Sequence, residues 1–312
     1  MLKVNVLKDL GQQGRGSGIA LSHKANQIAV ACGNDIKLWR LRDRMFLRTL
    51  EGNGYVKDLK YSPDGNKLIS SHYWTTLVWD ITNFERVLSI DNGNAYLSCD
   101  PVKNHVALSG DFKARDYDIY LWDLDSGVCI SRILTGYESM TTCLSFSPNG
   151  DLISSSERSG NMKAWNVNTG ELIYQDKHEY SVSHISFSQG SDKLAVGYEN
   201  GTIEICNLFK DEPKTRFSLH EDSIVNISWL PTDDQYMVSA SSDGAILVWN
   251  IEDIELVQRL KVKGRISRLI WEQQYLATAG RSVRLFSSAP NANLSHSISQ
   301  SEQKEVQRER ID

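Results

Sequence analysis

A histidine, two serines and an aspartate near residue 240 are the residue types in this chain with the greatest chemical potential. His220, Ser239 or Ser241, and Asp243 match a hydrolytic triad, in which histidine takes the proton of a serine nucleophile and a carboxylate orients the histidine. Trp249 follows six residues after Asp243. The set predicts hydrolysis only if the elements that carry it form an active site rather than a repeated scaffold.

The glycine-rich segment 14–18, Gly-Arg-Gly-Ser-Gly, is a second candidate because it superficially matches a phosphate-binding loop. It lacks the Gly-Lys-Ser/Thr ending of such loops. It also runs into the strand-like sequence Ile19-Ala20-Leu21 rather than a helix, so no helix dipole would face a phosphate. A flexible loop between sheets is the better interpretation.

Metal, disulfide and cofactor chemistry have little support in the sequence. The seven histidines are spread along the chain without an HExxH pair, and no Gly-x-Ser-x-Gly motif is present. The five cysteines form no Cys-x-x-Cys motif, and we expect them to be small, reduced core residues. We therefore expect no cofactor, no metal, no catalytic residues and no enzymatic activity.

The composition is that of a globular protein, with 312 residues of which 40% are hydrophobic. The net charge of −5 and the lack of a dense Lys/Arg block argue against direct binding to nucleic acid. No apolar run approaches the roughly 18 to 20 residues that span a bilayer. We expect a protein of the cytoplasm, the nucleus or both, with no membrane contact.

One repeated segment supplies the elements that must position these residues. Each repeat ends in an alternating strand closed by an aromatic residue or a substitute, at intervals of about 40 residues. These seven anchors are Trp39, Trp79, Trp122, Trp165, Cys206, Trp249 and Phe286. Turn sequences such as Ser62-Pro63-Asp64-Gly65 separate further strand signals, so each repeat predicts a four-stranded meander without helices.

Meanders of this size bury both faces only by stacking on one another, and a radial stack forms a β-propeller. Seven anchors predict seven blades. The sequence after Phe286 offers no fourth strand, whereas residues 6–10 (Val-Leu-Lys-Asp-Leu) match the outer strand expected at 46–50 (Phe-Leu-Arg-Thr-Leu). We therefore predict that the N-terminal strand closes blade 7 and removes a free edge.

The repeats resemble the WD40 repeat family over residues 2–288. The resemblance is carried by Trp-Asp at 79–80 and 122–123, by Trp-Asn at 165–166 and 249–250, and by the Ser-Pro-Asp/Asn-Gly turns. It implies an all-β fold, a seven-bladed β-propeller of WD40 type in residues 1–288. The polar segment 289–312 is predicted to be a disordered tail.

The resemblance also implies a structural role for His220, Ser239, Asp243 and Trp249. In that family a histidine, a hydroxyl residue, an aspartate and the tryptophan often form one buried hydrogen-bonded chain. A buried indole N–H needs an acceptor, a hydroxyl relays the chain, and a carboxylate accepts from imidazole. Only the sixth repeat has the full set, so we interpret these four residues as a structural tetrad.

Recognition is then the expected function, through loops displayed on one face of a rigid ring. Two neighbouring repeats have unusual turns between their second and third strands. Tyr73 and Trp74 replace the small polar residues usual in the family, and Phe112, Lys113 and Arg115 lie in an enlarged turn. Aromatic residues and arginine often dominate the energetics of interfaces, so we predict that these side chains contact partners.

Charge on the same face is predicted to be segregated into two arcs that orient a partner. Repeats 4 to 6 contribute an acidic arc, represented by Glu179 and Glu221. Its other members are Glu138, Glu157, Glu199 and Asp222. Repeats 7 and 1 contribute the basic arc of Lys261, Lys263, Arg265, Arg281 and Arg15.

The sequence thus predicts a non-catalytic scaffold or adaptor that binds other proteins or peptides. The propeller itself is expected to be monomeric within a larger hetero-complex. The first alternative is a substrate-recognition subunit for modified peptides or ubiquitin transfer, which a basic or aromatic pocket at the channel mouth would favour. The second alternative is an enzyme with a site in the central channel.

Overall fold

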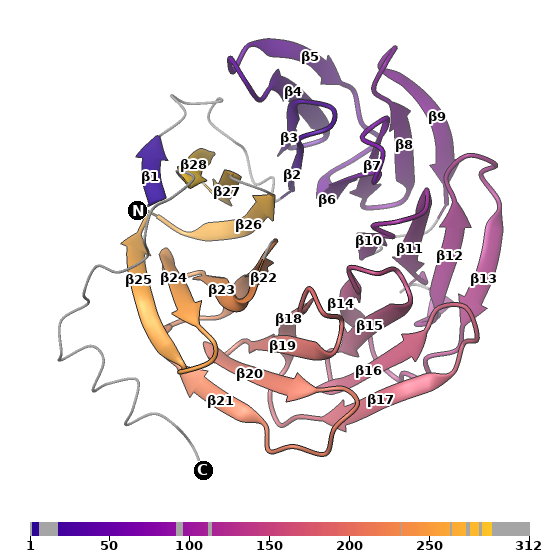
Figure 1. Ribbon diagram of the computed structural model, residues 1–312. Coiled ribbons are helices and arrows are strands. Elements are labelled where there is room, and N and C mark those ends of the chain that lie inside the picture. The colour runs from indigo at the N-terminus through magenta and orange to yellow at the C-terminus, as the bar shows by residue number, and fades with distance from the viewer. Residues whose placement is uncertain are drawn as a thin grey trace.

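The chain forms seven four-stranded antiparallel sheets arranged radially around one axis (Figure 1). This computed structural model describes residues 2–5, 18–91, 96–111, 114–231, 233–262, 264–272, 275–280 and 283–288. Seven sheets and an all-β architecture confirm the prediction made from the repeats. Within the described ranges, no helix has the length and apolar character needed to cross a membrane.

Each sheet is one blade, and the strands of blades 1 to 6 run from the axis outwards in sequence order. Blade 1 consists of β2 (Ile19–Ser22), β3 (Gln27–Cys32), β4 (Asp35–Arg40) and β5 (Phe46–Leu50). Blade 2 consists of β6 (Val56–Tyr61), β7 (Lys67–His72), β8 (Thr76–Asp80) and β9 (Glu85–Ile90). Blade 3 consists of β10 (Leu97–Cys99), β11 (His105–Ser109), β12 (Ile119–Asp123) and β13 (Cys129–Ile133). Blade 4 consists of β14 (Thr141–Phe146), β15 (Leu152–Glu157), β16 (Asn161–Asn166) and β17 (Leu172–Lys177). Blade 5 consists of β18 (Val182–Phe187), β19 (Lys193–Tyr198), β20 (Thr202–Asn207) and β21 (Thr215–Ser218). Blade 6 consists of β22 (Ile224–Leu230), β23 (Asp233–Ser241), β24 (Ala245–Asn250) and β25 (Glu255–Lys261).

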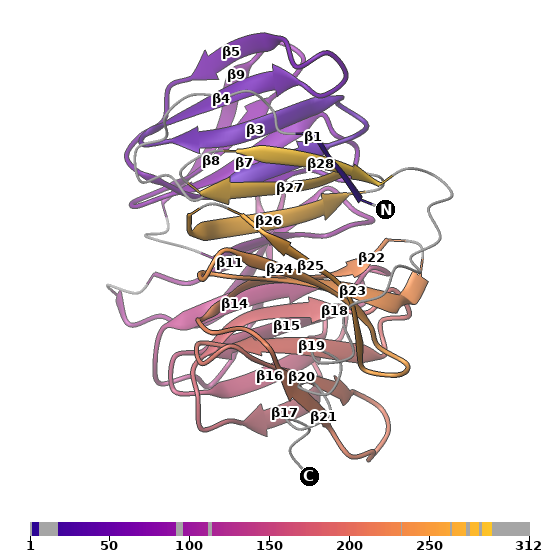
Figure 2. The same ribbon diagram turned by 90° about the vertical axis from the view of Figure 1, so that its left-hand side faces the viewer.

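Blade 7 takes its strands from both ends of the chain. Its order is β1-β28-β27-β26, with β26 (Ile266–Glu272), β27 (Tyr275–Gly280) and β28 (Arg284–Ser288). The outer strand is β1 (Leu2–Asn5), which pairs antiparallel with β28 so that residue 2 faces residue 288 (Figure 2). The pairing uses residues immediately before the segment 6–10 expected in this role, which lies outside the described residues, as does the tail 289–312.

The anchor residues lie on the third strand of each blade, and the six from Trp39 to Trp249 pack in clusters shared with a neighbouring blade. Trp249 is fully buried, and its ring centroid lies 4.7 Å from that of Phe217 in blade 5. The same cluster joins Ile203 of blade 5 to Ile227 of blade 6. Because each core is shared by two blades, the stability of one blade depends on its neighbours.

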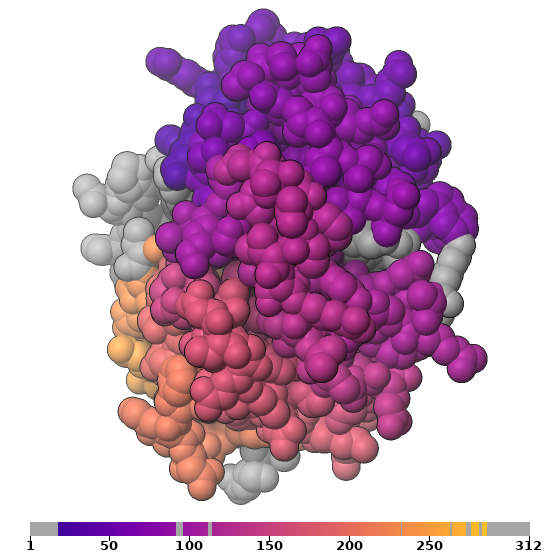
Figure 3. Space-filling view, turned by 90° about the vertical axis from the view of Figure 1, so that its right-hand side faces the viewer, coloured from indigo at the N-terminus to yellow at the C-terminus, as the bar shows by residue number. Residues whose placement is uncertain are grey.

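The cysteines are only partly the core residues expected. Cys143 and Cys206 are buried and unpaired, whereas Cys129 is exposed on outer strand β13. The side of the ring that carries β9 and β13 is shown in Figure 3. Cys129 is exposed because alternate side chains of an outer strand point away from the neighbouring blades.

Five of the seven innermost strands share a one-residue irregularity close to their first residue. The register shifts between Val56 and Asp58 in β6, and at the corresponding places in β14, β18, β22 and β26. Such a bulge leaves one residue unpaired and turns the following side chains. It sets which side chains of the innermost strands face the axis.

Candidate interaction surface

Two kinds of loop meet at one end of every blade, and we call this end of the ring the loop face. Since neighbouring strands are antiparallel, the turn from second to third strand lies beside the connection that enters the first strand. In blade 2, the imidazole Nδ1 of His72 at the end of β7 is 2.7 Å from the carbonyl oxygen of Gly54 in the connection. In blade 6, the Glu221 N–H donates to Asp243 over 3.1 Å.

The loop face of blade 2 presents two aromatic side chains. Tyr73 and Trp74 are 50% and 51% exposed, and their ring centroids lie 4.8 Å apart in an edge-to-face arrangement. The backbone N–H of His72 closes the turn by donating to the Thr75 carbonyl oxygen over 2.7 Å. One short turn therefore holds two large amphipathic rings toward solvent, and their contact with a partner stays a prediction.

A buried relay supports this turn from below. The indole N–H of Trp79 donates to the Ser70 hydroxyl over 2.9 Å, and that hydroxyl is 2.9 Å from Nε2 of His72. His72 then reaches Gly54 through its other nitrogen. Sequence analysis missed this relay because the histidine lies at the end of the second strand instead of before the first strand.

The enlarged turn of blade 3 is described only in part. Phe112 and Lys113 lie outside the described residues. Arg115 is exposed, with a φ of 55° in the left-handed region that non-glycine residues seldom adopt. The predicted meeting of this turn with Tyr73 and Trp74 stays a prediction.

The charged arcs agree with the structure at some positions and not at others. Glu179 and Glu221 are exposed on the loop face, as expected. Glu157 is only 1% exposed, so its place in the acidic arc was wrong. Its carboxylate turns inward because it accepts hydrogen bonds from the backbone N–H and hydroxyl groups of Ser139 and from the Ser159 hydroxyl. Of the basic arc, Lys263, Arg281 and Arg15 lie outside the described side chains.

The four tetrad residues of blade 6 lie together in one buried chain. The Trp249 indole N–H donates to the Ser239 hydroxyl over 2.8 Å, and this hydroxyl lies 2.7 Å from Nε2 of His220. Nδ1 of His220 faces the Asp243 carboxylate at 3.7 Å. The serine of the relay is thus Ser239, which is fully buried and unavailable to a substrate.

The electrostatics of the tetrad follow from burial and hydrogen bonding. Burial lowers the pKa of His220, which keeps the imidazole neutral. Burial alone would raise the pKa of Asp243, but the imidazole of His220 facing it and hydrogen bonds from the backbone N–H groups of Ala245 and Glu221 hold this pKa well below its usual range. The neutral imidazole of His220 therefore links the Ser239 hydroxyl to the ionised Asp243 carboxylate as part of the structure, and no proton transfer is needed to explain the arrangement.

We expect the stability of the protein to fall as the pH falls from 7.5 to 5.5. Burial is the largest cause of a lowered pKa in four histidines, His72, His178, His184 and His220. Since a histidine in the unfolded chain has a pKa of about 6.5, the unfolded state binds more protons in this interval. Each histidine contributes a slope of up to about 1.4 kcal/mol per pH unit to the free energy of unfolding.

Denaturant unfolding at several pH values measures this slope. His184→Gln should reduce it by about one group's share, because burial lowers the pKa of His184 to about 3 and its loss removes one titrating site. An equal free energy of unfolding at pH 7.5 and 5.5 would contradict the prediction.

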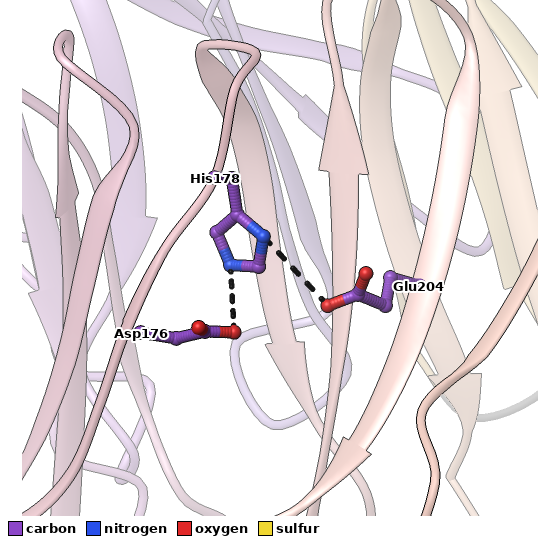
Figure 4. Close-up of side chains that lie close together, drawn as sticks. All are labelled: Asp176, His178 and Glu204. Carbon is purple, nitrogen blue, oxygen red and sulfur yellow. Dashed lines mark ion pairs between the residues drawn. The ribbon is translucent and has the colours of Figure 1, made fainter.

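One group of side chains at the junction of blades 4 and 5 has the residue types of a metal site. Asp176, His178 and Glu204 place their ligand atoms within 4.8 Å of one another (Figure 4). The carboxylates approach different ring nitrogens, with Asp176 3.3 Å from Nε2 and Glu204 3.8 Å from Nδ1. The Tyr198 hydroxyl also lies 2.7 Å from Nδ1.

Two cations already neutralise these carboxylates. Lys214 forms an ion pair with Asp176 and lies 3.7 Å from Glu204, while Arg216 binds Glu204 through two N–H groups at 2.6 and 3.0 Å. A metal ion at the centre would have to displace the Lys214 ammonium. The arrangement fits a network of ion pairs that joins blades 4 and 5 better than a metal centre, and we call this network the ionic clamp.

Comparisons with known proteins match separate parts of the chain. The model "Anaphase-promoting complex subunit 4 WD40 domain" matches residues 144–232, and "WD domain, G-beta repeat" matches residues 44–80. Autophagy-related protein 16 of Arabidopsis thaliana is 26% identical over 242 residues, which cover 72% of this chain and 45% of that protein.

Two further relatives match a shorter part of the chain. Protein groucho of Drosophila melanogaster and transducin-like enhancer protein 2 of Mus musculus are each 23% identical over 209 residues, 65% of this chain. The matches cover 28% and 26% of those proteins, so the chain spans less than half the length of these curated relatives. Seven four-stranded blades make the chain a seven-bladed β-propeller, and the matches show WD40-type sequence over residues 44–80 and 144–232.

Proposed function

We propose that the chain is a non-catalytic scaffold or adaptor, a subunit of a larger complex, that binds other proteins or peptides through its loop face. The observation that carries the proposal is the half-exposed pair of Tyr73 and Trp74. Large aromatic side chains with a polar atom are typical anchors of protein interfaces. Exposed apolar surface of this kind promotes non-specific association unless it belongs to a binding site.

The way the pair is held supports the same function. The relay from Trp79 through Ser70 and His72 to Gly54 joins the turn to the core of blade 2 and to the neighbouring connection. A surface that is ordered before it binds loses little conformational entropy on association. Rigid display of a few anchors is therefore the mechanism that we propose.

The double variant Tyr73→Ala and Trp74→Ala is expected to lose the principal partners of the chain. Truncating interface anchors of this kind costs about 2 kcal/mol or more each, or about 30-fold in affinity. The measurement is quantitative mass spectrometry of proteins captured by the tagged full chain from its own cells.

Phe209→Ala is the matched control, because Phe209 is 62% exposed in the turn after β20, at the opposite end of the ring. Retention of every partner by the double variant, or an equal loss with Phe209→Ala, would remove the loop face of blade 2 from the proposal. Unfolding curves of all three proteins should show that the fold is intact.

A further inference from the structure

One residue of each blade, in the innermost strand or directly before it, occupies the same register position beside the axis. Each directly precedes the residue that pairs with the middle of the second strand; Asp58, for example, precedes Leu59, which pairs with Ser70. The equivalent residues of blades 3 to 7 follow from the same pairings. We call the six with side chains the channel ring: Asp58, Tyr96, Cys143, His184, Asn226 and Arg268.

The channel ring lines a hollow at the centre of the propeller. All six of its residues, together with Lys60 two positions further along β6, border this space. The hollow contains about 470 Å³ free of atoms, including its open mouth. It is thus a place where side chains from blades 2 to 7 reach one small ligand.

Arg268 has unused hydrogen-bond donors in this hollow. Blade 1 has Gly18 at the ring position, and Arg268 of blade 7 lies 3.8 Å from the Asp58 carboxylate of blade 2. This distance joins Nη2 to Oδ2 and exceeds a hydrogen bond. Its Nε is buried and has no hydrogen-bond partner among the residues that the structure describes. A guanidinium group has five N–H donors, so several remain for a ligand.

Positive charge exceeds negative charge around the hollow. The Lys60 ammonium forms no ion pair or hydrogen bond with any described residue, and the Lys57 ammonium lies 3.6 Å from the ring centroid of Tyr96. Asp58 is the one carboxylate among the residues that line the hollow in the described part of the chain. Burial lowers the pKa of Lys57 to about 8, while the charge of Asp58 opposes this shift and that of Arg268 adds to it.

Neutral donors stand opposite the cations. The Ile227 N–H donates to Nδ1 of His184 over 3.2 Å, so the proton of the neutral ring lies on Nε2. The side-chain amide of Asn226 lies 3.0 Å from Nε2, and its oxygen must face this N–H as the acceptor, which leaves the amide NH₂ group as a donor. Burial, with Arg268 and Lys60, lowers the pKa of His184 to about 3, so the ring stays uncharged. The amide N–H groups of Asn226 and the cations of Arg268 and Lys60, which outnumber the carboxylate of Asp58, form a donor set that suits an anion.

We propose that the channel ring binds a phosphate-type oxyanion, held by Arg268 and Lys60 and contacted by Asn226. A guanidinium fork matches the geometry of a tetrahedral oxyanion, and lysine adds a point charge. The oxyanion comes either as free phosphate or as the monoester of a small molecule. The proposal does not depend on Tyr73 and Trp74, the pair on which the proposed function rests.

The test is ³¹P NMR line broadening, with inorganic phosphate and O-phosphoserine as separate probes, at constant ionic strength set with sodium chloride. The full chain is expected to broaden the signal saturably, and Arg268→Gln and Lys60→Gln each weaken binding by about tenfold or more. Asp58→Asn removes a repelling charge and is expected to tighten binding roughly threefold or more. Arg42→Gln, at an exposed arginine outside the hollow, should leave binding unchanged.

The opposite signs expected for Asp58→Asn and Arg268→Gln separate an anion site from simple damage to the fold. Weaker binding in both variants, equal binding in all of them, or no saturable broadening would overturn the proposal. If Arg268→Gln does not fold, Lys60→Gln and Asp58→Asn carry the same test. Tighter binding of O-phosphoserine identifies a monoester as the source of the oxyanion, and tighter binding of phosphate identifies the free ion.

Discussion

Deletion of residues 2–5 is expected to lower the free energy of unfolding by about 2–5 kcal/mol and to make the protein prone to self-association. These residues form β1, which pairs with β28 at four positions, and each lost backbone hydrogen bond costs about 0.5–1.5 kcal/mol net. The deletion also turns β28 into an open edge, which pairs readily with other chains. Denaturant unfolding and size-exclusion chromatography measure the two effects.

A cross-link tests the same pairing without removing any residue. Lys3 faces Ser287 in the register, so the double variant Lys3→Cys and Ser287→Cys is expected to form a disulfide under mild oxidation. Lys3→Cys combined with Ser267→Cys is the control that should not cross-link, because β26 is not adjacent to β1 in the sheet. Unchanged stability of the deletion together with no cross-link between residues 3 and 287 would show that the last blade is completed in another way.

Ser239→Ala is expected to destabilise the protein by about 2–4 kcal/mol, more than a typical buried serine. Its hydroxyl accepts the Trp249 indole N–H and lies 2.7 Å from His220, so its removal leaves two buried polar groups without a partner. Each such group costs about 1–3 kcal/mol. The midpoint of denaturant unfolding at pH 7.5 measures the loss.

The matched control is Ser241→Ala on the same strand. Ser241 is equally buried, but its hydroxyl bonds only backbone groups: it donates to the Asp222 carbonyl over 2.8 Å and accepts from the Asp243 N–H over 3.2 Å. We expect a cost of about 1 kcal/mol for this variant. Equal costs for the two serines would mean that the relay through Ser239 adds nothing to the stability of blade 6.

The parts of the fold that sequence predicted best depend on local repetition. The anchors such as Trp79 and Trp249, and the turns such as Ser62-Pro63-Asp64-Gly65, recur at one spacing, and each records a strand or turn formed within about 40 residues. Seven anchors therefore gave the number of blades. The tetrad of blade 6 was also found, because its residue types have few other reasons to occur together.

The parts that sequence missed depend on contacts between blades or on a changed position within the repeat. Glu157 was placed on the surface by its type, but its neighbours Ser139 and Ser159 bind it inside blade 4. The clamp around Glu204 and the channel ring join residues of different blades, whose approach no local pattern records. The register shifts of the innermost strands could have been found only from the pairing itself.

The pairing of residues 2–5 with 285–288 also sets an order on biosynthesis. Blades 1 to 6 are each made of consecutive residues and can form as the chain leaves the ribosome, since their contacts are local. Blade 7 cannot be completed until β28, the last strand described, has been translated. Until then β1 has no partner strand, and the nascent protein is an open arc of blades. The exposed edges at the two ends of this arc can bind chaperones or pair with a neighbouring polypeptide.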